Sequence, residues 1–244
     1  MQSKNNLFIS VVIPAYNEER TLSKTLDSLQ KQRSKNNFEV IVVDNNSTDQ
    51  TAQIARTYKK TLDIKVINEQ KKGRSPARRA GFAQARGEII LSTDADTIVP
   101  ENWVEKMGAY FNDKDIIAVT GRSKIIDCSL RVNLLFNFLQ PIFMHAYRIV
   151  FGHYWLSGFN FAIRKDAYIK AGGFNPNLNS QEDTELAFRV SKLGKIKFIN
   201  SPIVIASGRR FQQGLLQGFY VYIKSYIFYF FLKNEEKTFL PDIR

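Results

Sequence analysis

Cysteine and histidine are scarce in this chain of 244 residues, which has one cysteine, Cys128, and two histidines. A single cysteine excludes an internal disulfide and any zinc site built on several cysteines. Scarce cysteine is also common in proteins of a reducing compartment. With only His145 and His153 available, a metal site made of several histidines is not expected.

Two common nucleotide-binding loops are missing as well. The chain contains no GxxxxGKS or GxxxxGKT loop, which excludes a P-loop site on motif grounds. No GxGxxG follows the first predicted strand, which argues against a dinucleotide-binding domain. No run reaches the roughly 18 consecutive apolar residues of a membrane-spanning helix. The apolar run at 7–13 is short and ends at Pro14, so we expect no secretion signal.

The composition is that of a globular protein with an excess of positive charge. Hydrophobic residues make up 44% of the chain and charged residues 24%. Thirty-five basic and 23 acidic residues give a net charge of +12. This charge indicates an anionic partner, such as a nucleotide, a nucleic acid or an acidic membrane surface. We expect no nucleic-acid binding, because the basic residues do not form a run with interleaved aromatic residues.

The first half of the chain alternates between strand and helix patterns. Four apolar, β-branched runs predict buried strands, and the segments between them have apolar residues at helical spacing. These runs are 7–13, 38–43, 64–67 and 88–92. Such alternation predicts an α/β fold with a mainly parallel sheet flanked by helices, and we expect two lobes packed on one sheet.

The second half is richer in aromatic residues. Two helix-length stretches, 130–151 and 212–232, carry aromatic residues on most sides. Such helices are either buried or lie in a membrane interface, where Tyr and Phe beside Lys and Arg suit the headgroup region. Three alternatives stay open for them: packing as core, peripheral contact with a membrane, or a homodimer interface.

Acidic and small polar residues follow three of the predicted strands. They lie at 14–18, 44–49 and 94–96, and in a parallel sheet these ends meet at one edge, where α/β proteins bind ligands. Any one of them alone is better explained as a turn or a helix cap, but three at successive strand ends favour a binding site. Asp94 and Asp96, one residue apart, offer the hard oxygen ligands that suit Mg²⁺ or Mn²⁺, with phosphate oxygens filling the remaining positions.

Taken in order, these motifs resemble those of the family 2 inverting glycosyltransferases, which have the Rossmann-like GT-A fold. Each motif is weak alone, but the set extends over most of the chain. The matching segments are 11–18 (VVIPAYNE), 42–49 (VVDNNSTD), 94–96 (DAD), 157–164 (SGFNFAIR), 172–174 (GGF) and 182–186 (EDTEL), followed by Arg189.

The resemblance implies a nucleotide-sugar-binding lobe at 1–115 and an acceptor-binding, catalytic lobe with amphipathic helices at 116–244. Asp44 would bind the base edge, Arg78 the diphosphate, and Asp94 and Asp96 a metal ion. The residues to which it assigns substrate contact are Pro14, Ala15, Tyr16, Glu18, Asp44, Asn46, Gly73, Arg74, Arg78, Asp94, Ala95, Gly158, Asn160 and Glu182.

Asp183 matches the general base of the family, which accepts the proton of the acceptor hydroxyl. An alternative is that Glu182 and Asp183 cap the helix that follows. One departure concerns a late histidine that completes the metal shell in many members. The corresponding stretch here contains Arg209 and Arg210, which would pair with the diphosphate or an anionic acceptor, or lie in solvent.

The implied function is transfer of a sugar from a UDP- or GDP-sugar to a glycan hydroxyl or a lipid-linked acceptor, in glycolipid or cell-envelope polysaccharide synthesis. The expected location is the cytoplasm, at the inner face of the membrane. A catalytically idle module that binds a nucleotide sugar or a glycan is the alternative, although an idle relative has no physical reason to retain Asp94, Asp96 and Asp183 together.

Overall fold

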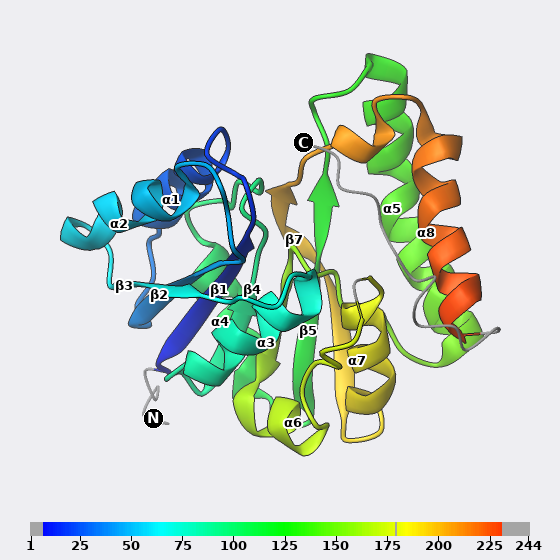
Figure 1. Ribbon diagram of the computed structural model, residues 1–244. Helices are drawn as coiled ribbons and strands as arrows, with labels where there is room; N and C mark the ends of the chain where they lie inside the picture. Colours follow the sequence, from blue (N-terminus) through cyan, green and yellow to red (C-terminus); the bar gives the residue numbers. More distant parts are fainter. Residues whose placement is uncertain (1–6, 179, 231–244) are drawn as a thin grey trace.

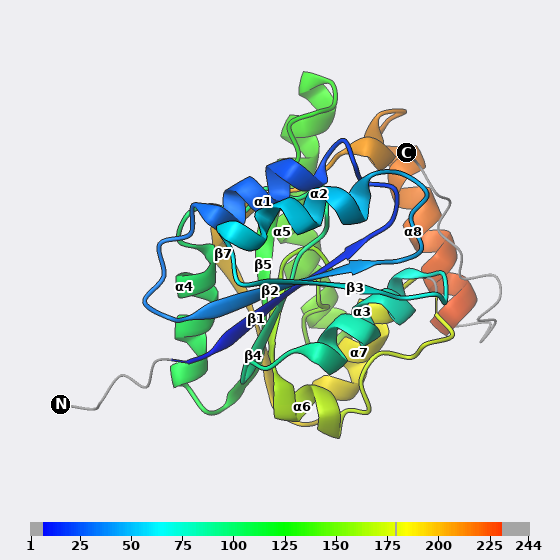
Figure 2. The ribbon, with the colours of Figure 1, turned by 60° about the vertical axis from the view of Figure 1, so that its left-hand side comes forward.

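The structure is a computed structural model that describes residues 7–178 and 180–230. Figure 1 shows a single sheet with helices on both faces, and Figure 2 shows the same layers turned by 60°. The strands are β1 (Ile9–Ala15), β2 (Phe38–Asp44), β3 (Ile64–Asn68), β4 (Ile89–Ser92), β5 (Ile116–Lys124), β6 (Phe161–Arg164) and β7 (Lys195–Ile205). The helices are α1 (Leu22–Gln30), α2 (Thr51–Thr57), α3 (Arg74–Gln84), α4 (Trp103–Ala109), α5 (Leu130–Phe151), α6 (Lys165–Lys170), α7 (Glu182–Val190) and α8 (Leu215–Phe230). Three short 3₁₀ helices are η1 (Tyr58–Lys60), η2 (Tyr110–Asn112) and η3 (Arg209–Phe211).

The seven strands lie in the order β3-β2-β1-β4-β6-β5-β7. Strands β1 to β4 pair in parallel, as do β5 and β7, whereas β6 runs antiparallel to both of its neighbours. The predicted α/β fold with a mainly parallel sheet is confirmed. The four strands predicted from apolar runs correspond to β1, β2, β3 and β4.

Each face of the sheet carries its own hydrophobic core, because successive side chains of a strand point to opposite faces. Val11 and Ile13 of β1 pack on one face with Leu26 of α1 and Trp103 of α4. Val12 packs on the other face, where α3 and α7 contribute Phe82, Leu186 and other buried residues. Strands buried on both faces explain why the sequence shows continuous apolar runs instead of alternation.

Both halves of the chain build the same sheet. The division expected at residues 115 and 116 falls directly before β5. Strand β6 nevertheless inserts between β4 and β5, so the later half of the chain hydrogen-bonds directly to the earlier half. This insertion places the segment before β6 beside the end of β4.

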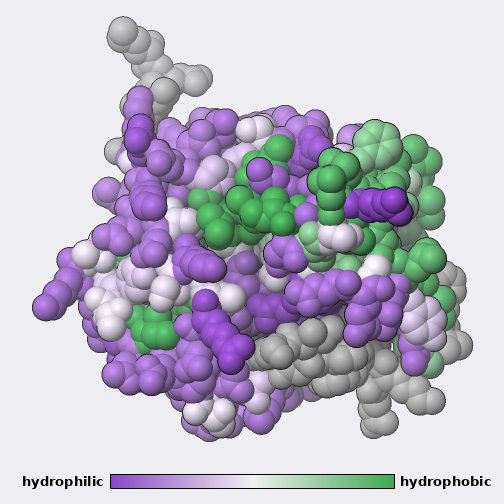
Figure 3. All heavy atoms as spheres, turned by 90° about the horizontal axis from the view of Figure 1, so that it is seen from above, coloured by the Kyte–Doolittle hydropathy of each residue, from purple (hydrophilic) through white to green (hydrophobic). Residues whose placement is uncertain are grey.

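Helices α5 and α8 pack along each other through aromatic rings. Phe136 stacks on Phe219 with ring centroids 6.4 Å apart, and Phe143 meets the same ring edge-on at 5.4 Å. Figure 3 shows apolar side chains gathered on the side of the molecule that these helices form. The predicted aromatic stretches at 130–151 and 212–232 correspond to α5 and α8, which are partly core and partly surface. Residues 212–214 precede α8, and 231–232 lie outside the described residues. Their exposed large apolar side chains are Leu130, Leu134, Leu135, Phe138, Ile142, Phe143, Ile149, Val150 and Phe151 of α5, with Leu216, Tyr220, Ile223 and Ile227 of α8.

Helix α5 is long and apolar enough to cross a membrane by length and composition, unlike any other helix in the described part of the chain. The expectation that no segment reaches this length requires correction. That expectation counted unbroken apolar residues, and Asn137, Gln140 and Arg148 interrupt the run while the mean hydropathy stays high. Only 17% of its most apolar window is buried. Core helices of soluble proteins also meet this criterion, so length and composition alone do not assign α5 to a membrane.

Candidate active site

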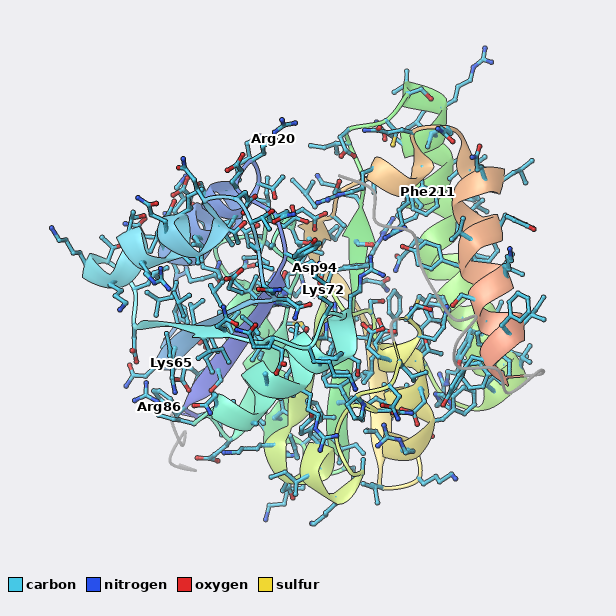
Figure 4. All side chains as sticks on the ribbon, in the orientation of Figure 1. Arg20, Lys65, Lys72, Arg86, Asp94 and Phe211 are labelled. Carbon is cyan, nitrogen blue, oxygen red and sulfur yellow. The ribbon has the colours of Figure 1, made fainter. Side chains whose placement is uncertain are left out.

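The polar strand ends predicted to converge do meet at the carboxyl edge of the sheet. Ala15 at the end of β1 lies opposite Asp44 at the end of β2, and β4 pairs with the other side of β1. The backbone N–H of Asn45 donates to the carbonyl of Ala15 at 2.8 Å. In Figure 4, Asp94 lies near the centre of the molecule at this edge.

The loops after β1 and β2 bind each other through short polar side chains. Asn17 adopts a left-handed conformation with φ of 52°, and its Oδ1 accepts a hydrogen bond from the backbone N–H of Thr48 at 2.8 Å. Its own N–H donates to the Ser47 hydroxyl at 3.0 Å. Asp44 is buried and accepts from the Ser47 N–H at 3.1 Å, while Asn46, with φ of 63°, is exposed. The two predicted nucleotide-pocket segments therefore form one structural unit.

Asn45 fixes the loop that leads into α3, a role that the sequence analysis did not assign to it. Its Nδ2 donates to the carbonyls of Glu69 and Lys71 at 2.9 and 2.8 Å, and its Oδ1 accepts from the Gly73 N–H at 2.8 Å. Gly73 has φ of 134°, which only glycine adopts readily, and immediately precedes Arg74 at the start of α3. The only sequence signal was the position of Asn45 inside a motif already assigned to the site.

Lys72, in the same loop, lies over Tyr16, with its Nζ 5.3 Å from the ring centroid. Pro14 is half-buried and Ala15 buried, so Tyr16 is the first residue after β1 with an aromatic surface at the edge. A tyrosine ring with a cation over it can stack on a nucleobase on its other face. The predicted pocket residues 14–16 thus lie beside a basic residue that the sequence analysis did not select.

Arg78 of α3 is almost completely enclosed, with 3% of its side chain exposed. Its Nη2 donates to Asp94 Oδ1 at 2.6 Å, and its Nη1 is ion-paired with Glu182. Burial alone would lower the pKa of the guanidinium, but Asp94 and Glu182 more than offset it, so the pKa is raised. Arg78 therefore ties the end of β4 to the start of α7, and both ends of its guanidinium already have carboxylate partners.

Arg209 forms a second bridge at the same edge. Its guanidinium donates to both oxygens of Glu18, at 3.1 and 3.0 Å, and is ion-paired with Asp96. Burial would lower the pKa of Arg209, but Glu18 and Asp96 raise it. Its neighbour Arg210 lies 6.0 Å from the ring centroid of Tyr222 in α8. The alternative that Arg209 lies in solvent is wrong, because its side chain contacts two carboxylates.

Asp183 lies in the first turn of α7 and faces the loop before β6. Its Oδ2 accepts from the N–H of Gly158 at 2.7 Å, and its Oδ1 accepts from the N–H of Thr184 at 2.7 Å. Burial, followed by the charge of Glu182, raises the pKa of Asp183 to about 6 against the opposing effect of Arg78. A carboxylate with a pKa near neutrality is suited to accept a proton in a reaction.

Gly158 fills the narrow space between Arg78 and Asp183. A Cβ atom there would lie 2.7 Å from Arg78 Cζ and 3.0 Å from Asp183 Oδ2. The Ser92 hydroxyl, at the end of β4, donates to the carbonyl of Gly158 at 2.7 Å. Only glycine leaves room here for an arginine and the candidate base to lie side by side.

Asn160 is not brought to the edge with the other predicted residues. It is fully buried, its Nδ2 donates to the Arg122 carbonyl at 3.0 Å, and its Oδ1 accepts from Trp103 Nε1 at 2.8 Å. Both ends of its amide are therefore occupied inside the protein. The structure gives Asn160 a packing position, in contrast to the substrate contact predicted from the sequence.

The sequence of the chain settles its family. Residues 10–172 match the sequence profile of glycosyl transferase family 2. The chain belongs to this family. It is 34% identical over 215 residues to a probable glycosyltransferase, YdaM, of Bacillus subtilis, which covers 80% of this chain and 49% of that protein. The chain therefore spans about half the length of that curated relative.

Solved structures of other glycosyltransferases share the fold. A TarS fragment of Staphylococcus aureus in complex with UDP superposes with a TM-score of 0.66 at 23% identity, over 82% of this chain and 60% of the fragment. The mannosyltransferase PcManGT of Pyrobaculum calidifontis, in complex with GDP-Man and Mn²⁺, gives 0.66 at 23% identity, over 88% of this chain and 64% of that one. These neighbours confirm the GT-A fold predicted from the motifs.

Two carboxylates of this family 2 chain have the chemistry of ligands for a divalent cation. Asp94 and Asp96 offer the hard oxygen ligands that Mg²⁺ and Mn²⁺ prefer. Within residues 7–178 and 180–230, however, no three His, Cys, Asp or Glu side chains are grouped to hold a metal ion. The two aspartates therefore fit a divalent cation when a diphosphate brings the remaining oxygen ligands.

Proposed function

We propose that this chain is an inverting glycosyltransferase that moves a sugar from a nucleoside diphosphate to a hydroxyl or a lipid phosphate. The observation that carries the proposal is the gathering of Glu18, Asp94, Asp96 and Asp183 at one sheet edge of a family 2 fold. Arg78 pairs with Asp94, Arg209 pairs with Glu18 and Asp96, and backbone N–H groups bind Asp183. Such a gathering of charged groups with raised carboxyl pKa values is typical of a catalytic site.

The donor belongs to the side built by residues 1–115. Asp44 and Tyr16 would bind the nucleobase, with Lys72 and Arg74 beside the diphosphate. UDP or GDP is the proposed nucleotide, since structures with this fold contain UDP in one case and GDP-Man in another. Residues 116–244 would bind the acceptor and supply the base.

In the proposed reaction, the acceptor oxygen attacks the anomeric carbon while the bond from that carbon to the diphosphate oxygen breaks. With a hydroxyl acceptor, the Asp183 carboxylate takes the hydroxyl proton; the oxygen of a lipid phosphate is already ionised and needs no base. In both cases one displacement inverts the configuration at the anomeric carbon. A Mg²⁺ or Mn²⁺ ion held by Asp94 and Asp96 would offset charge on the departing diphosphate. Arg78 keeps Asp94 in position for this role. Gly158 orients Asp183 through its N–H.

The acceptor side of the proposal rests on α5 and α8. Leu134 and Phe138 of α5 and Leu216 and Tyr220 of α8 lie on exposed apolar faces of two adjoining helices. A chain with a net charge of +12 is attracted to anionic lipid, and aromatic side chains suit the headgroup region. We therefore place the protein at the inner face of the cytoplasmic membrane, with a lipid-linked or glycan acceptor. A homodimer that covers these faces is the competing arrangement.

Calorimetric titration with UDP, GDP, CDP and ADP, first with Mn²⁺ and then with EDTA, tests the donor site. We expect one nucleotide to bind tightly in Mn²⁺ and at least about tenfold more weakly in EDTA, because a cation held by Asp94 and Asp96 would offset the charge of the phosphates. The double variant Asp94→Ala, Asp96→Ala should lose this metal-dependent gain. Equal affinity in Mn²⁺ and EDTA would overturn the metal assignment.

Turnover of the nucleotide sugar that binds distinguishes an enzyme from a catalytically idle binding module. Release of free nucleoside diphosphate, abolished by Asp183→Asn with nucleotide affinity retained, supports an enzyme. Tight binding without turnover in any acceptor preparation, including anionic vesicles that contain polyprenyl phosphate, would favour a binding module.

A further inference from the structure

Arg209 occupies an unusual position at the carboxylate edge. It comes from η3, after β7, and reaches Glu18 after β1 and Asp96 after β4. Its guanidinium is within hydrogen-bond distance of both Glu18 oxygens and is ion-paired with Asp96. Both aspartates proposed to hold the metal therefore already have a positive partner from the protein itself, Arg78 for Asp94 and Arg209 for Asp96.

The charges around Asp96 explain why a cation is needed there. Asp96 and Glu18 are both ion-paired with the same Arg209 guanidinium, so their two negative charges lie near each other. Asp94 has Arg78 as its partner, whereas Arg209 is the cation that the structure places on Asp96 and Glu18. Without Arg209, Glu18 and Asp96 would lose the guanidinium that both contact, which is unfavourable in a partly buried site.

A divalent cation and the Arg209 guanidinium both stabilise the ionised Asp96 carboxylate. Arg209 contacts Asp96 Oδ2, so a metal ion held by Asp96 would share this carboxylate with the guanidinium. Since two cations in contact with one carboxylate repel each other, binding of one weakens binding of the other.

We infer that Arg209 is the resident counter-cation of Asp96 and Glu18 and competes with divalent metal for this site. This inference rests on the proposed nucleotide-sugar site. The metal alone binds weakly, because it must displace the guanidinium. A nucleoside diphosphate adds negative charge and oxygen ligands, so metal and nucleotide would bind together while the Arg209 guanidinium pairs with the incoming diphosphate in place of Asp96.

The segment that carries Arg209 is also attached to the aromatic helices. Phe211, two residues later, packs on Phe136 of α5 with ring centroids 4.9 Å apart and on Phe219 of α8 at 5.3 Å. Figure 4 shows Phe211 at the upper end of these helices. If Arg209 leaves Asp96 when metal binds, Phe211 would transmit this movement to α5 and α8, on the proposed acceptor side.

The test is a titration of nucleotide-free protein with Mn²⁺. Binding is measured as the loss of the free Mn²⁺ signal in electron paramagnetic resonance. We expect Arg209→Gln to bind Mn²⁺ at least about tenfold more tightly than the wild type, the lower end of the effect of an adjacent guanidinium on a carboxylate. Adding Asp96→Asn to this variant should abolish the gain and so locate it. Equal or weaker Mn²⁺ binding by Arg209→Gln would overturn the inference.

Two further variants make the result specific. Arg33→Gln removes the same charge from an exposed pair with Glu101 and should leave Mn²⁺ affinity unchanged. Arg209→Lys keeps a charge but loses the planar fork that reaches two carboxylates, so its Mn²⁺ affinity should lie between those of wild type and Arg209→Gln. If Arg209→Gln does not melt cooperatively, the Arg209→Lys variant is the test. A Mn²⁺ affinity of Arg209→Lys no tighter than that of the wild type would then overturn the inference that Arg209 competes with metal.

Mn²⁺ titrations with and without nucleotide distinguish failure of this inference from failure of the proposed function. In the wild type, UDP or GDP should increase Mn²⁺ affinity by a larger factor than in Arg209→Gln, because the variant has no guanidinium to displace. If none of the four nucleoside diphosphates binds, the proposed function fails. The Mn²⁺ titrations still decide the role of Arg209 in that case.

Discussion

At the residue scale, two arginines organise the acids of the site. Arg78 joins Asp94 to Glu182, and Arg209 joins Asp96 to Glu18. Ionised carboxylates at a partly buried edge are stable only when cations or hydrogen-bond donors face them. The site is therefore preformed by ion pairs, and the charges that a substrate must meet are already in position.

The pH dependence of turnover follows from Asp183. Its pKa is raised to about 6, so the carboxylate is mostly protonated at pH 5 and mostly ionised at pH 7. Since only the ionised form accepts a proton, kcat at saturating donor and metal should rise about tenfold from pH 5 to pH 7. Measuring nucleoside diphosphate release across this range checks the prediction.

Burial also raises the pKa of Asp96 to about 6, so a matched variant tests directly whether turnover requires the Asp183 carboxylate. Asp183→Asn should remove turnover at every pH while nucleotide affinity in Mn²⁺ stays within about threefold of wild type. Loss of nucleotide binding in this variant would assign Asp183 to the donor site instead. A flat kcat profile in the wild type would also argue against a base at this position.

At the scale of elements, Asn160 joins strands and helices away from the ligand edge. Its amide connects the segment before β6 to β5 and to Trp103 of α4. Asn160→Ala should lower the free energy of unfolding by about 1–3 kcal/mol, because a buried carbonyl and an indole N–H lose their partner. Denaturant unfolding measures this, and nucleotide affinity should stay unchanged.

The control for this prediction is Asn200→Ala, which removes the same amide from an exposed position in β7. It should alter the free energy of unfolding by less than about 0.5 kcal/mol. A drop in nucleotide affinity without loss of stability in Asn160→Ala would restore the substrate contact predicted from the sequence.

The elements differ in how well their sequences predicted them. Strands β1 and β2 are continuous apolar runs, and they were predicted within two residues of their observed ends. Strand β6 has four residues, and β7 contains Lys, Asn and Ser at the edge of the sheet, so neither shows the apolar run of a central strand. Strand β5 carries Thr120 and Ser123 buried in its interior, which breaks the pattern.

At the scale of the whole molecule, the exposed faces of α5 and α8 and the net charge predict binding to anionic membranes. The protein should float with phosphatidylglycerol vesicles and less with phosphatidylcholine vesicles, and added salt should weaken the interaction. The double variant Phe138→Glu, Ile142→Glu places two charges on the α5 face and should reduce binding at least about tenfold, since charged groups resist transfer from water.

Ile169→Glu is the control, because it changes an exposed apolar residue on α6, remote from α5 and α8 in Figure 1. It should bind vesicles like the wild type. If the wild type does not float and instead forms a dimer that Phe138→Glu, Ile142→Glu dissociates in sedimentation velocity, the two helices serve as a subunit interface.

The sequence by itself determined the α/β class, the family and the segments that form the site. These features depend on local patterns, namely apolar runs, strand-end motifs and the order of those motifs. Only the tertiary structure decided which charges meet, since Arg209 lies 191 residues from Glu18 and 113 from Asp96 along the chain. It also decided that Asn160 faces the interior. Pairs so distant in sequence are set by strand order and packing, because the insertion of β6 and the course of β7 bring them together, and no local pattern encodes that geometry.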